Sequence, residues 1–276
     1  MRADLFLVEH GFATTRSQAQ RLIGSGVQWR VVVDEAEVAA PWKRVAKNGD
    51  EIVDNAEVEV LDNTEAQYIS RGGLKLEGAL RATGLDVTGL RCLDVGQSTG
   101  GFTDCLLQHG AAQVVGVDVG HGQLHASMRD DDRVVCLEGI NARSLTATDL
   151  IAACAVKIAA TGQFNAEIEQ KINPVFDFLT GDLSFISLTL VLPAVVRVLK
   201  ADGHLLMLVK PQFELQPGQI GKGGIVRDAA HFEFVEKRLR DACAELGIDV
   251  LGWMQSTIEG GDGNREFFIH GKKTAM

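Results

Sequence analysis

The chain has 276 residues, of which 46% are hydrophobic and 23% are charged, and its formal net charge is −10. This length allows one large or two modest domains, and no segment approaches the ~20 consecutive apolar residues that cross a bilayer. The negative charge argues against a strongly basic nucleic-acid-binding protein, although a local basic face can still contact RNA.

Cysteine usage and the first residues of the chain indicate a cytoplasmic protein. Five cysteines are scattered without a C-x-x-C pair: Cys92, Cys105, Cys136, Cys154 and Cys243. We expect reduced core residues, not disulfides or metal ligands, and no metal site. The N-terminus has no apolar run followed by a small-residue cleavage site, so we expect neither secretion nor a membrane partner.

Residues 1–61 have the pattern of a small α+β domain. Thr14 or Thr15 is suited to cap a helix that ends at Gly24 or Gly26, and β-like segments follow at residues 27–33 and 51–60. The polar residues 62–69 then have the composition of a linker, and residues 70–276 form the second predicted domain.

The second domain alternates predicted strands and helices. Strands are expected at residues 91–95, 114–119, 134–138, 175–181 and 204–209, with helices at 78–83, 102–109, 188–199 and 232–246. Such alternation predicts an α/β fold with a mostly parallel, doubly wound, Rossmann-like sheet. Residues 249–256 and 266–270 flank a glycine-rich loop and predict a closing antiparallel hairpin. Residues 149–173 are alanine-rich and then polar, which suggests an insertion.

The most informative stretch is residues 93–103, LDVGQSTGGFT, in which an apolar strand leads through a glycine-rich turn into a helix. Its G-x-x-x-G-G spacing departs from the G-x-G-x-x-G of dinucleotide sites, and no P-loop lysine follows. It fits S-adenosylmethionine (SAM) better, because this cofactor needs a close turn for its methionine end and a carboxylate for its ribose. An ordinary connection between a strand and a helix is the alternative. The candidate cofactor-binding residues are Asp94, Gly96, Ser98, Gly100, Phe102, Asp118, Val119 and Asn141.

Four charged residues stand at the ends of predicted elements: Lys75, Asp182, Lys210 and Glu266. The carboxyl ends of parallel strands line the ligand crevice of a doubly wound sheet, so Asp182 and Lys210 are expected to face the cofactor. Burial and a neighbouring ammonium both lower the pKa of a lysine, which lets it act as a general base toward a hydroxyl. Rim salt bridges are the alternative interpretation for each residue alone.

Six motifs in order, DVGQSTGGFTD, VVGVDVGHGQL, NAR, GDLSFISL, LVKPQFE and GNREFF, resemble those of the TlyA family. That family comprises SAM-dependent 2′-O-methyltransferases of ribosomal RNA with an FtsJ-like catalytic domain. The resemblance implies that Lys75, Asp182, Lys210 and Glu266 form a catalytic tetrad with Lys210 as the base. It also implies a cytidine ribose as substrate and a ribosomal subunit, the large one favoured, as partner. One departure is Gln97, where relatives usually carry alanine.

Residues 1–61 are similar to the S-four-type RNA-binding domain, named after a ribosomal protein. The similarity implies that basic residues of its helical face contact RNA phosphates, and the candidates are Arg2, Arg16, Arg21, Lys43 and Arg44. A module for protein contacts is the alternative for this domain. For the whole chain, the competing functions are a non-catalytic RNA-binding assembly factor and a membrane-active cytolysin, a label some relatives carry. Nothing in the sequence indicates an oligomeric state.

Overall fold

The computed structural model describes residues 1–32, 40–62, 67–152 and 173–275. The chain forms two compact units, residues 1–74 and residues 75–276. The predicted boundary, a linker over residues 62–69, stays a prediction, and residues 63–66 lie outside the described residues. Most of the predicted insertion at 149–173 also lies outside them.

The first unit packs two helices against a small antiparallel sheet. Helix α1 spans Ala3–Glu9 and α2 spans Arg16–Gly26, and the Thr15 side chain caps α2 by accepting a hydrogen bond from the Gln18 amide. Strand β1 (Val27–Val31) lies between β2 (Lys43–Arg44) and β3 (Ala56–Val60). The buried residues that hold these elements together include Phe6, Leu7, Leu22, Val27 and Ile52.

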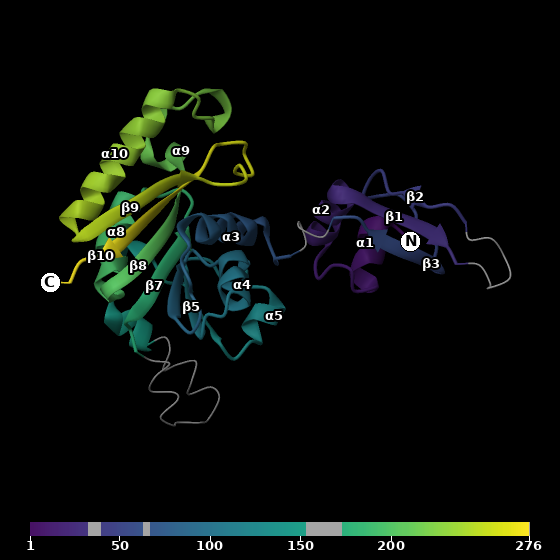
Figure 1. The fold of residues 1–276 in the computed structure, drawn as a ribbon, viewed down its shortest axis with the longest axis horizontal. Helices are drawn as coiled ribbons and strands as arrows, with labels where there is room; N and C mark the ends of the chain where they lie inside the picture. Colours follow the sequence, from purple (N-terminus) through teal and green to yellow (C-terminus); the bar gives the residue numbers. More distant parts are fainter. Residues whose placement is uncertain (33–39, 63–66, 153–172, 276) are drawn as a thin grey trace. The chain divides into compact units, whose positions relative to one another are not determined.

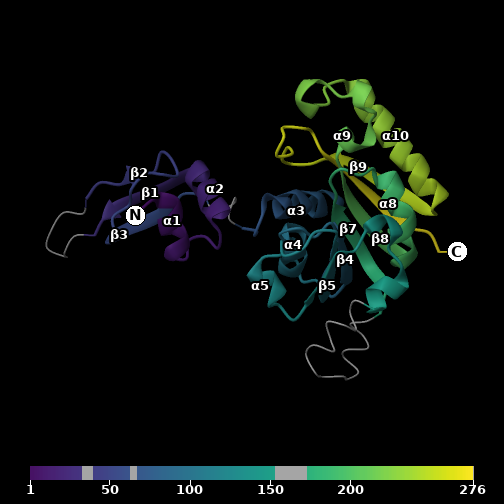
Figure 2. The same ribbon diagram turned by 180° about the vertical axis from the view of Figure 1, so that it is seen from behind.

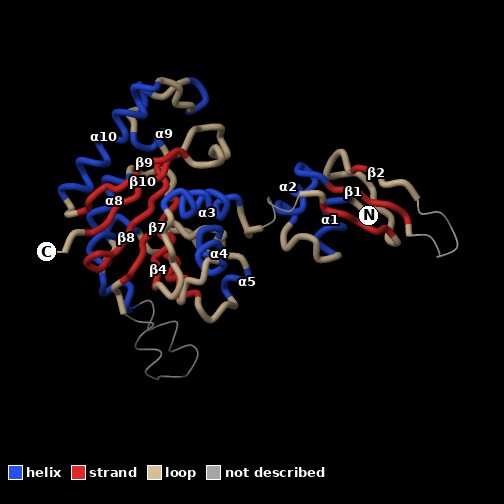
Figure 3. Tube along the Cα trace, in the orientation of Figure 1, coloured by secondary structure: helices blue, strands red, loops and turns tan. Residues whose placement is uncertain are grey.

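The second unit is built on a seven-stranded sheet (Figures 1 and 3). The strand order is β6-β5-β4-β7-β8-β10-β9; the first five strands are parallel, and β10 runs antiparallel to both of its neighbours, β8 and β9. The strands are β4 (Arg91–Val95), β5 (Gln113–Asp118), β6 (Val134–Glu138), β7 (Phe176–Asp182), β8 (Leu199–Val209), β9 (Ile248–Gln255) and β10 (Phe267–Lys273). The Rossmann-like α/β fold with a C-terminal hairpin is therefore confirmed.

Helices cover both faces of this sheet (Figures 1 and 2). On one face lie α3 (Arg71–Thr83) and α4 (Gly101–Gln108), and on the other α8 (Leu188–Val195) and α10 (Ala229–Glu245). Side chains alternate along each strand, so Leu93 and Val95 of β4 join the buried cluster beneath α8 and α10. Asp94, the residue between them, is therefore directed to the other face. The shorter helices are α5 (Ala126–Arg129) and α9 (Pro211–Glu214) and the 3-10 turns η2 (Ala142–Ser144), η3 (Val196–Val198), η4 (Pro217–Gln219) and η5 (Lys222–Gly224).

Two elements, α3 and β8, begin much earlier than the sequence predicts. Helix α3 starts at Arg71 instead of Gly78, because its glycines are sites of close packing. A Cβ on Gly73 would lie 2.3 Å from the buried ring of Tyr68, so glycine is needed there for contact and does not end the helix. Strand β8 starts at Leu199 instead of His204 and passes through Asp202, whose φ is 60°.

Candidate active site

The glycine-rich turn after β4 lies beside the end of β7. Gly96 has a φ of 83°, and a Cβ there would lie 2.8 Å from the carbonyl oxygen of Asp182. Gly100, with a φ of 97°, occupies the N-cap position of α4, where a Cβ would meet Leu124 at 2.8 Å. Both positions combine a left-handed backbone with a close approach, which glycine alone tolerates without strain. The turn therefore brings the predicted cofactor loop next to a predicted catalytic residue.

Asp118, at the end of β5, organises the neighbouring backbone. Its carboxylate accepts hydrogen bonds from the amides of Ser98 and Gly120, each at 2.7 Å. The next residue, Val119, is 71% exposed. A fixed carboxylate followed by an exposed apolar side chain suits a ribose and a purine respectively. The side chains present at this strand end thus fit the nucleoside half of SAM.

Asp94 lies beneath the turn and not on its surface. It is fully buried, and Thr103 Oγ1 donates to its Oδ2 at 2.7 Å, while Gln97 Nε2 donates to Thr103 Oγ1 at 2.9 Å. Burial raises the pKa of Asp94 to about 7, with Asp182 adding to the effect. The Asp94 side chain supports the turn from below through Thr103, and its predicted contact with the cofactor stays a prediction.

Two further residues predicted at the cofactor are occupied by local packing or capping. Phe102 is 4% exposed and packs against Phe268, with ring centroids 6.1 Å apart, because α4 turns this side chain toward the sheet. Phe102 therefore has a core role, and its predicted contact with the cofactor stays a prediction. The Asn141 side chain caps η2 by accepting from the Arg143 amide at 3.0 Å.

The four tetrad residues form two ion pairs. Lys75 Nζ lies 2.5 Å from Glu266 Oε2, and Lys210 Nζ lies 2.5 Å from Asp182 Oδ1. Burial raises the pKa of Glu266; Lys75 and Lys210 oppose this shift, while Asp182 adds to it. All four charges therefore interact, although Lys75 and Glu266 are separated by 191 positions in sequence.

The fold explains how these residues meet. Asp182 and Lys210 follow the neighbouring parallel strands β7 and β8, and Glu266 directly precedes β10, which runs antiparallel to β8. The end of β8 and the start of β10 thus lie at the same edge of the sheet. Lys75 reaches this edge from α3. Burial is strong at two members, Lys75 and Glu266, at 8% and 3% exposed.

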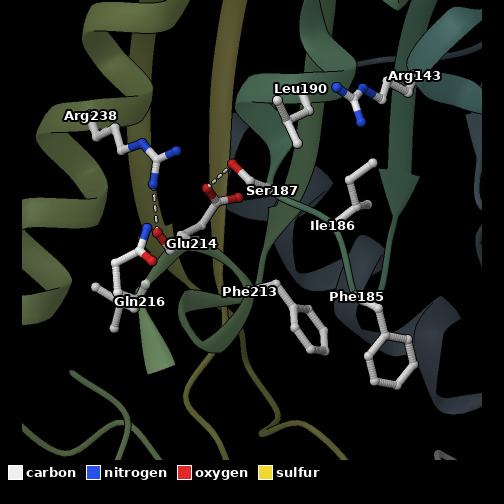
Figure 4. A pocket seen from close by; sticks show the side chains of 10 residues that line it. Arg143, Phe185, Ile186, Ser187, Leu190, Phe213, Glu214, Gln216 and Arg238 are labelled. Atoms are coloured by element: carbon white, nitrogen blue, oxygen red, sulfur yellow. Dashed lines mark hydrogen bonds between the residues drawn. The ribbon is translucent and has the colours of Figure 1, made fainter. Parts of the chain in front are cut away.

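An open cavity of about 600 Å³ lies between the segments that follow β7 and β8, the strands that carry Asp182 and precede Lys210 (Figure 4). Its rim carries Phe185, which is 91% exposed and has a φ of 65°, and whose ring lies 5.0 Å from that of Phe213. The neighbouring Ser184 hydroxyl accepts a hydrogen bond from Lys210 at 2.9 Å. Neither Phe185 nor Ser184 is among the site residues predicted from the sequence. The lining residues are Arg143, Phe185, Ile186, Ser187, Leu190, Phe213, Glu214, Leu215, Gln216 and Arg238.

The cavity floor is held by a buried carboxylate. Glu214 accepts hydrogen bonds from Ser187 Oγ at 2.5 Å and from the Leu188 amide at 2.7 Å, and burial raises its pKa. Arg238 donates to the Glu214 carbonyl oxygen and to Thr189. The α8 N-terminus and α9 are therefore tied together, which fixes Phe185 and Phe213 at the rim.

The basic residues predicted to bind RNA lie in the first unit. Arg2 and Arg16 both contact Asp4, and the Arg21 guanidinium lies 3.5 Å from the Tyr68 carbonyl oxygen. Lys43 and Arg44 are exposed on β2, an edge strand, with the Lys43 ammonium 5.3 Å from the Trp29 ring centre. These side chains can reach a partner from the surface of the unit.

Among the described residues, no helix is both long and apolar enough to span a membrane. Within the same ranges, no three His, Cys, Asp or Glu side chains are grouped so as to hold a metal ion.

Comparisons with known proteins give the family. Residues 68–273 match the FtsJ-like methyltransferase family. The chain is 40% identical to a 16S/23S rRNA (cytidine-2′-O)-methyltransferase named TlyA from Mycobacterium tuberculosis, covering 97% of this chain and 88% of that one. It is 35% identical to Hemolysin A of Brachyspira hyodysenteriae, over 98% of this chain and 99% of that one. A solved structure from Streptococcus thermophilus, also named as a hemolysin, superposes with a TM-score of 0.68 at 38% identity, over 99% of this chain and 88% of that one. The chain therefore belongs to the FtsJ-like methyltransferase family and, within it, to the TlyA group.

Proposed function

We propose that this protein transfers the methyl group of SAM to the 2′-hydroxyl of a cytidine ribose in ribosomal RNA. The observation that carries the proposal is the meeting of two ion pairs, Lys75–Glu266 and Asp182–Lys210, beside the glycine-rich turn. Lysine and carboxylate side chains gathered at one place can position a hydroxyl and take up its proton, which a hydroxyl needs because it is a poor nucleophile. The choice of cytidine and ribosomal RNA is supported by the printed activity of the TlyA relative.

Bound SAM supplies a methyl group on a positively charged sulfur, so the reaction needs alignment and removal of one proton. In the proposed mechanism Lys210 Nζ, in its unprotonated form, would accept the proton of the 2′-hydroxyl, and the ribose oxygen would take the methyl group, with SAM leaving as a neutral thioether. Asp182 and Ser184 hold Lys210 at the strand end. Lys75 and Glu266 hold the ribose in line, which supplies the orientation on which such a transfer depends.

The turn above the tetrad provides the cofactor contacts in this proposal. Gly96, Ser98 and Gly100 face the methionine end, Asp118 binds the ribose hydroxyls, and Val119 packs on the adenine. Asn141 borders the adenine from η2. The support for these roles is the position of each residue at the carboxyl edge of the parallel strands, where ligands of doubly wound sheets bind.

The aromatic rim of the cavity supports a nucleotide as the acceptor. Every base has a face that stacks on an aromatic ring, so an exposed phenylalanine beside the tetrad suits a base swung out of its stack. Phe185 and Phe213 lie three positions after Asp182 and Lys210 respectively. A base on Phe185 would therefore lie next to the residues that act on its ribose.

The first unit, as proposed, is the RNA-binding domain, with Arg2, Arg16, Arg21, Lys43 and Arg44 on the phosphates. We place the linker at residues 62–69 and the methyltransferase domain at residues 70–276. The proposed partner is the large ribosomal subunit, and the proposed site of action is the cytoplasm, where subunits are assembled. The first unit's fold supports this reading, since its helices and edge strand present these basic side chains outward.

The test is transfer of labelled methyl from SAM to ribosomal subunits from cells that lack this gene. Lys210→Ala is expected to lower transfer by about 10²–10⁴-fold, the usual loss of a general base, with nearly unchanged SAM binding. The matched control is Lys200→Ala, because Lys200 pairs with Asp177 near the opposite ends of β8 and β7. That variant is expected to act as the wild type.

Label at one position of large-subunit RNA, resistant to alkaline cleavage and lost with Lys210→Ala, is the expected result. Wild-type activity in Lys210→Ala would remove this lysine as the base. SAM binding without transfer to either subunit would point to the non-catalytic assembly factor instead.

A further inference from the structure

A single buried carboxylate organises the basic face of the first unit. Asp4 is fully buried, and its two oxygens accept hydrogen bonds from three side chains. Arg2 donates through Nε and Nη2, both at 3.1 Å, Arg16 through Nε at 2.7 Å, and Gln20 through Nε2 at 3.1 Å. The hydrogen bond from Arg2, followed by those from Arg16 and Gln20, holds the pKa of Asp4 well below its usual range, against the effect of burial. Asp4 is therefore ionised at neutral pH.

Asp4 connects parts of the unit that are distant in sequence. It lies in the first turn of α1, whereas Arg16 is the first residue of α2 and Gln20 lies one turn further along α2. A cation at a helix N-terminus is destabilising, because it opposes the helix dipole. Arg16 thus occupies a position that helix formation alone disfavours, and the ion pair with Asp4 offsets this cost.

Both arginines remain available to a partner outside the protein. The Arg2 side chain is 48% exposed and the Arg16 side chain is 53% exposed. Across the described ranges, the structure gives no hydrogen-bond partner to either terminal nitrogen of Arg16 or to Nη1 of Arg2. Two guanidinium groups fixed on one carboxylate thus present unused donors with the planar geometry that matches phosphate oxygens.

We propose that Asp4 is a positioning residue, which holds Arg2 and Arg16 in the geometry that receives phosphates of the RNA backbone. A free arginine side chain has many rotamers, and it loses part of this conformational entropy on binding. Asp4 fixes both side chains beforehand, so less entropy is lost when RNA binds. This inference rests on the proposed action on ribosomal RNA.

The sign of one mutational effect separates positioning from simple charge. Asp4→Asn keeps the shape of the side chain and removes one negative charge from a face that binds a polyanion. Charge alone therefore predicts tighter RNA binding. Positioning predicts weaker binding, because an amide holds two guanidinium groups less firmly than a carboxylate does.

The experiment measures the dissociation constant of the full-length protein for ribosomal subunits from cells lacking this gene. Asp4→Asn is expected to weaken binding by about fivefold or more, from the lost preorganisation of two arginines. Glu57→Gln is the matched control, since it also removes one negative charge from an arginine pair of this unit, here the pair of the exposed Glu57 with Arg30. The control is expected to bind as the wild type or slightly more tightly, and equal or tighter binding by Asp4→Asn overturns the inference.

A second variant excludes an effect of misfolding. Arg16→Lys changes a half-exposed side chain and keeps its charge, but a single ammonium cannot contact both Asp4 and a phosphate in the manner of a guanidinium. Its binding is expected to weaken as in Asp4→Asn, and wild-type affinity would overturn the inference. If circular dichroism shows that the first unit is unfolded in Asp4→Asn, the affinity of Arg16→Lys alone tests the positioning role of Asp4. The proposed function fails separately, if the wild type itself transfers no methyl group to these subunits.

Discussion

At the scale of single residues, Phe185 shows the clearest strain near the active site. Its φ of 65° places a phenylalanine in the left-handed region, which costs roughly 1–2 kcal/mol for a residue with a Cβ. Its ring is also 91% exposed, so burial does not compensate. Residues held in such conformations concentrate at functional sites, which agrees with the position of Phe185 three residues after Asp182.

Phe185→Ala tests whether the exposed ring binds the acceptor base. Base–aromatic stacking contributes about 1–3 kcal/mol, so kcat/KM for ribosomal RNA is expected to fall by roughly 5–150-fold. The dissociation constant of SAM is expected to stay unchanged. Phe234→Ala is the control, since Phe234 is 50% exposed on α10. Equal losses in both variants would show that the effect does not come from stacking at the tetrad.

The sequence predicts some site residues better than others. Asp182 and Lys210 end apolar strands, a pattern that places them at the ligand edge, and the structure pairs them there. Phe185 could not be found in this way, because a positive φ at a phenylalanine follows from the packing of the β7–α8 connection. Asp94 and Phe102 belong to the correct motif, but the direction of their side chains depends on which face of β4 and α4 is covered.

At the scale of elements, strand β5 and the cofactor turn are packed closely at one point. The buried Gln97 side chain lies directly on Gly116, where a Cβ would approach its amide group to 1.9 Å. Gln97 also donates the hydrogen bond that links Thr103 to Asp94 below the turn. Gln97 stands where relatives usually carry alanine. Its larger side chain fits here because Gly116 on the neighbouring strand has no side chain.

Gly116→Ala is expected to displace the Gln97 amide and break its hydrogen bond to Thr103. The expected cost is about 1 kcal/mol or more in the free energy of unfolding, together with weaker SAM binding as the turn shifts. The double variant Gln97→Ala/Gly116→Ala shortens the obstructing side chain. It is expected to recover much of the lost free energy of unfolding and of the lost SAM affinity. Denaturant unfolding and SAM titration measure these effects. Additive losses in the double variant would show that the two residues do not interact.

Elements with strong local signals were predicted well, and those shaped by packing less so. Strands β4 and β6 have the predicted bounds, because continuous apolar runs bounded by polar residues define them. The predicted helix is shorter than α3, because Gly72 and Gly73 have a low helix propensity. In the folded protein, packing of Gly73 against Tyr68 stabilises the helix at this point. Helix α1 was not predicted either, since its seven residues are too few for a clear period.

At the scale of the whole molecule, a net charge of −10 has to coexist with binding to a polyanion. The proposed solution is local: five basic side chains on the first unit contact phosphates, and the remaining surface carries the excess of acids. The number of phosphate contacts, not the net charge, sets how steeply affinity falls with salt.

The logarithm of the affinity for ribosomal subunits is therefore expected to fall with the logarithm of salt concentration at a slope of about −4 if only five cations make phosphate contacts. The double variant Lys43→Ala/Arg44→Ala, on the exposed edge strand β2, is expected to reduce this slope by about 2. Titrations at several salt concentrations measure both slopes. An unchanged slope in the variant would exclude β2 from the RNA-binding face.

The pairing of Lys75 with Glu266 also has a consequence for protein synthesis. Ribosomes make the chain from its N-terminus, so the cofactor turn and β4 to β8 are available to fold while β10 is still unmade. Until Glu266 emerges, Lys75 lacks its partner across 191 positions of sequence. On the proposed mechanism, a chain that stops before Glu266 is therefore expected to lack methyl transfer even if its cofactor turn already holds SAM.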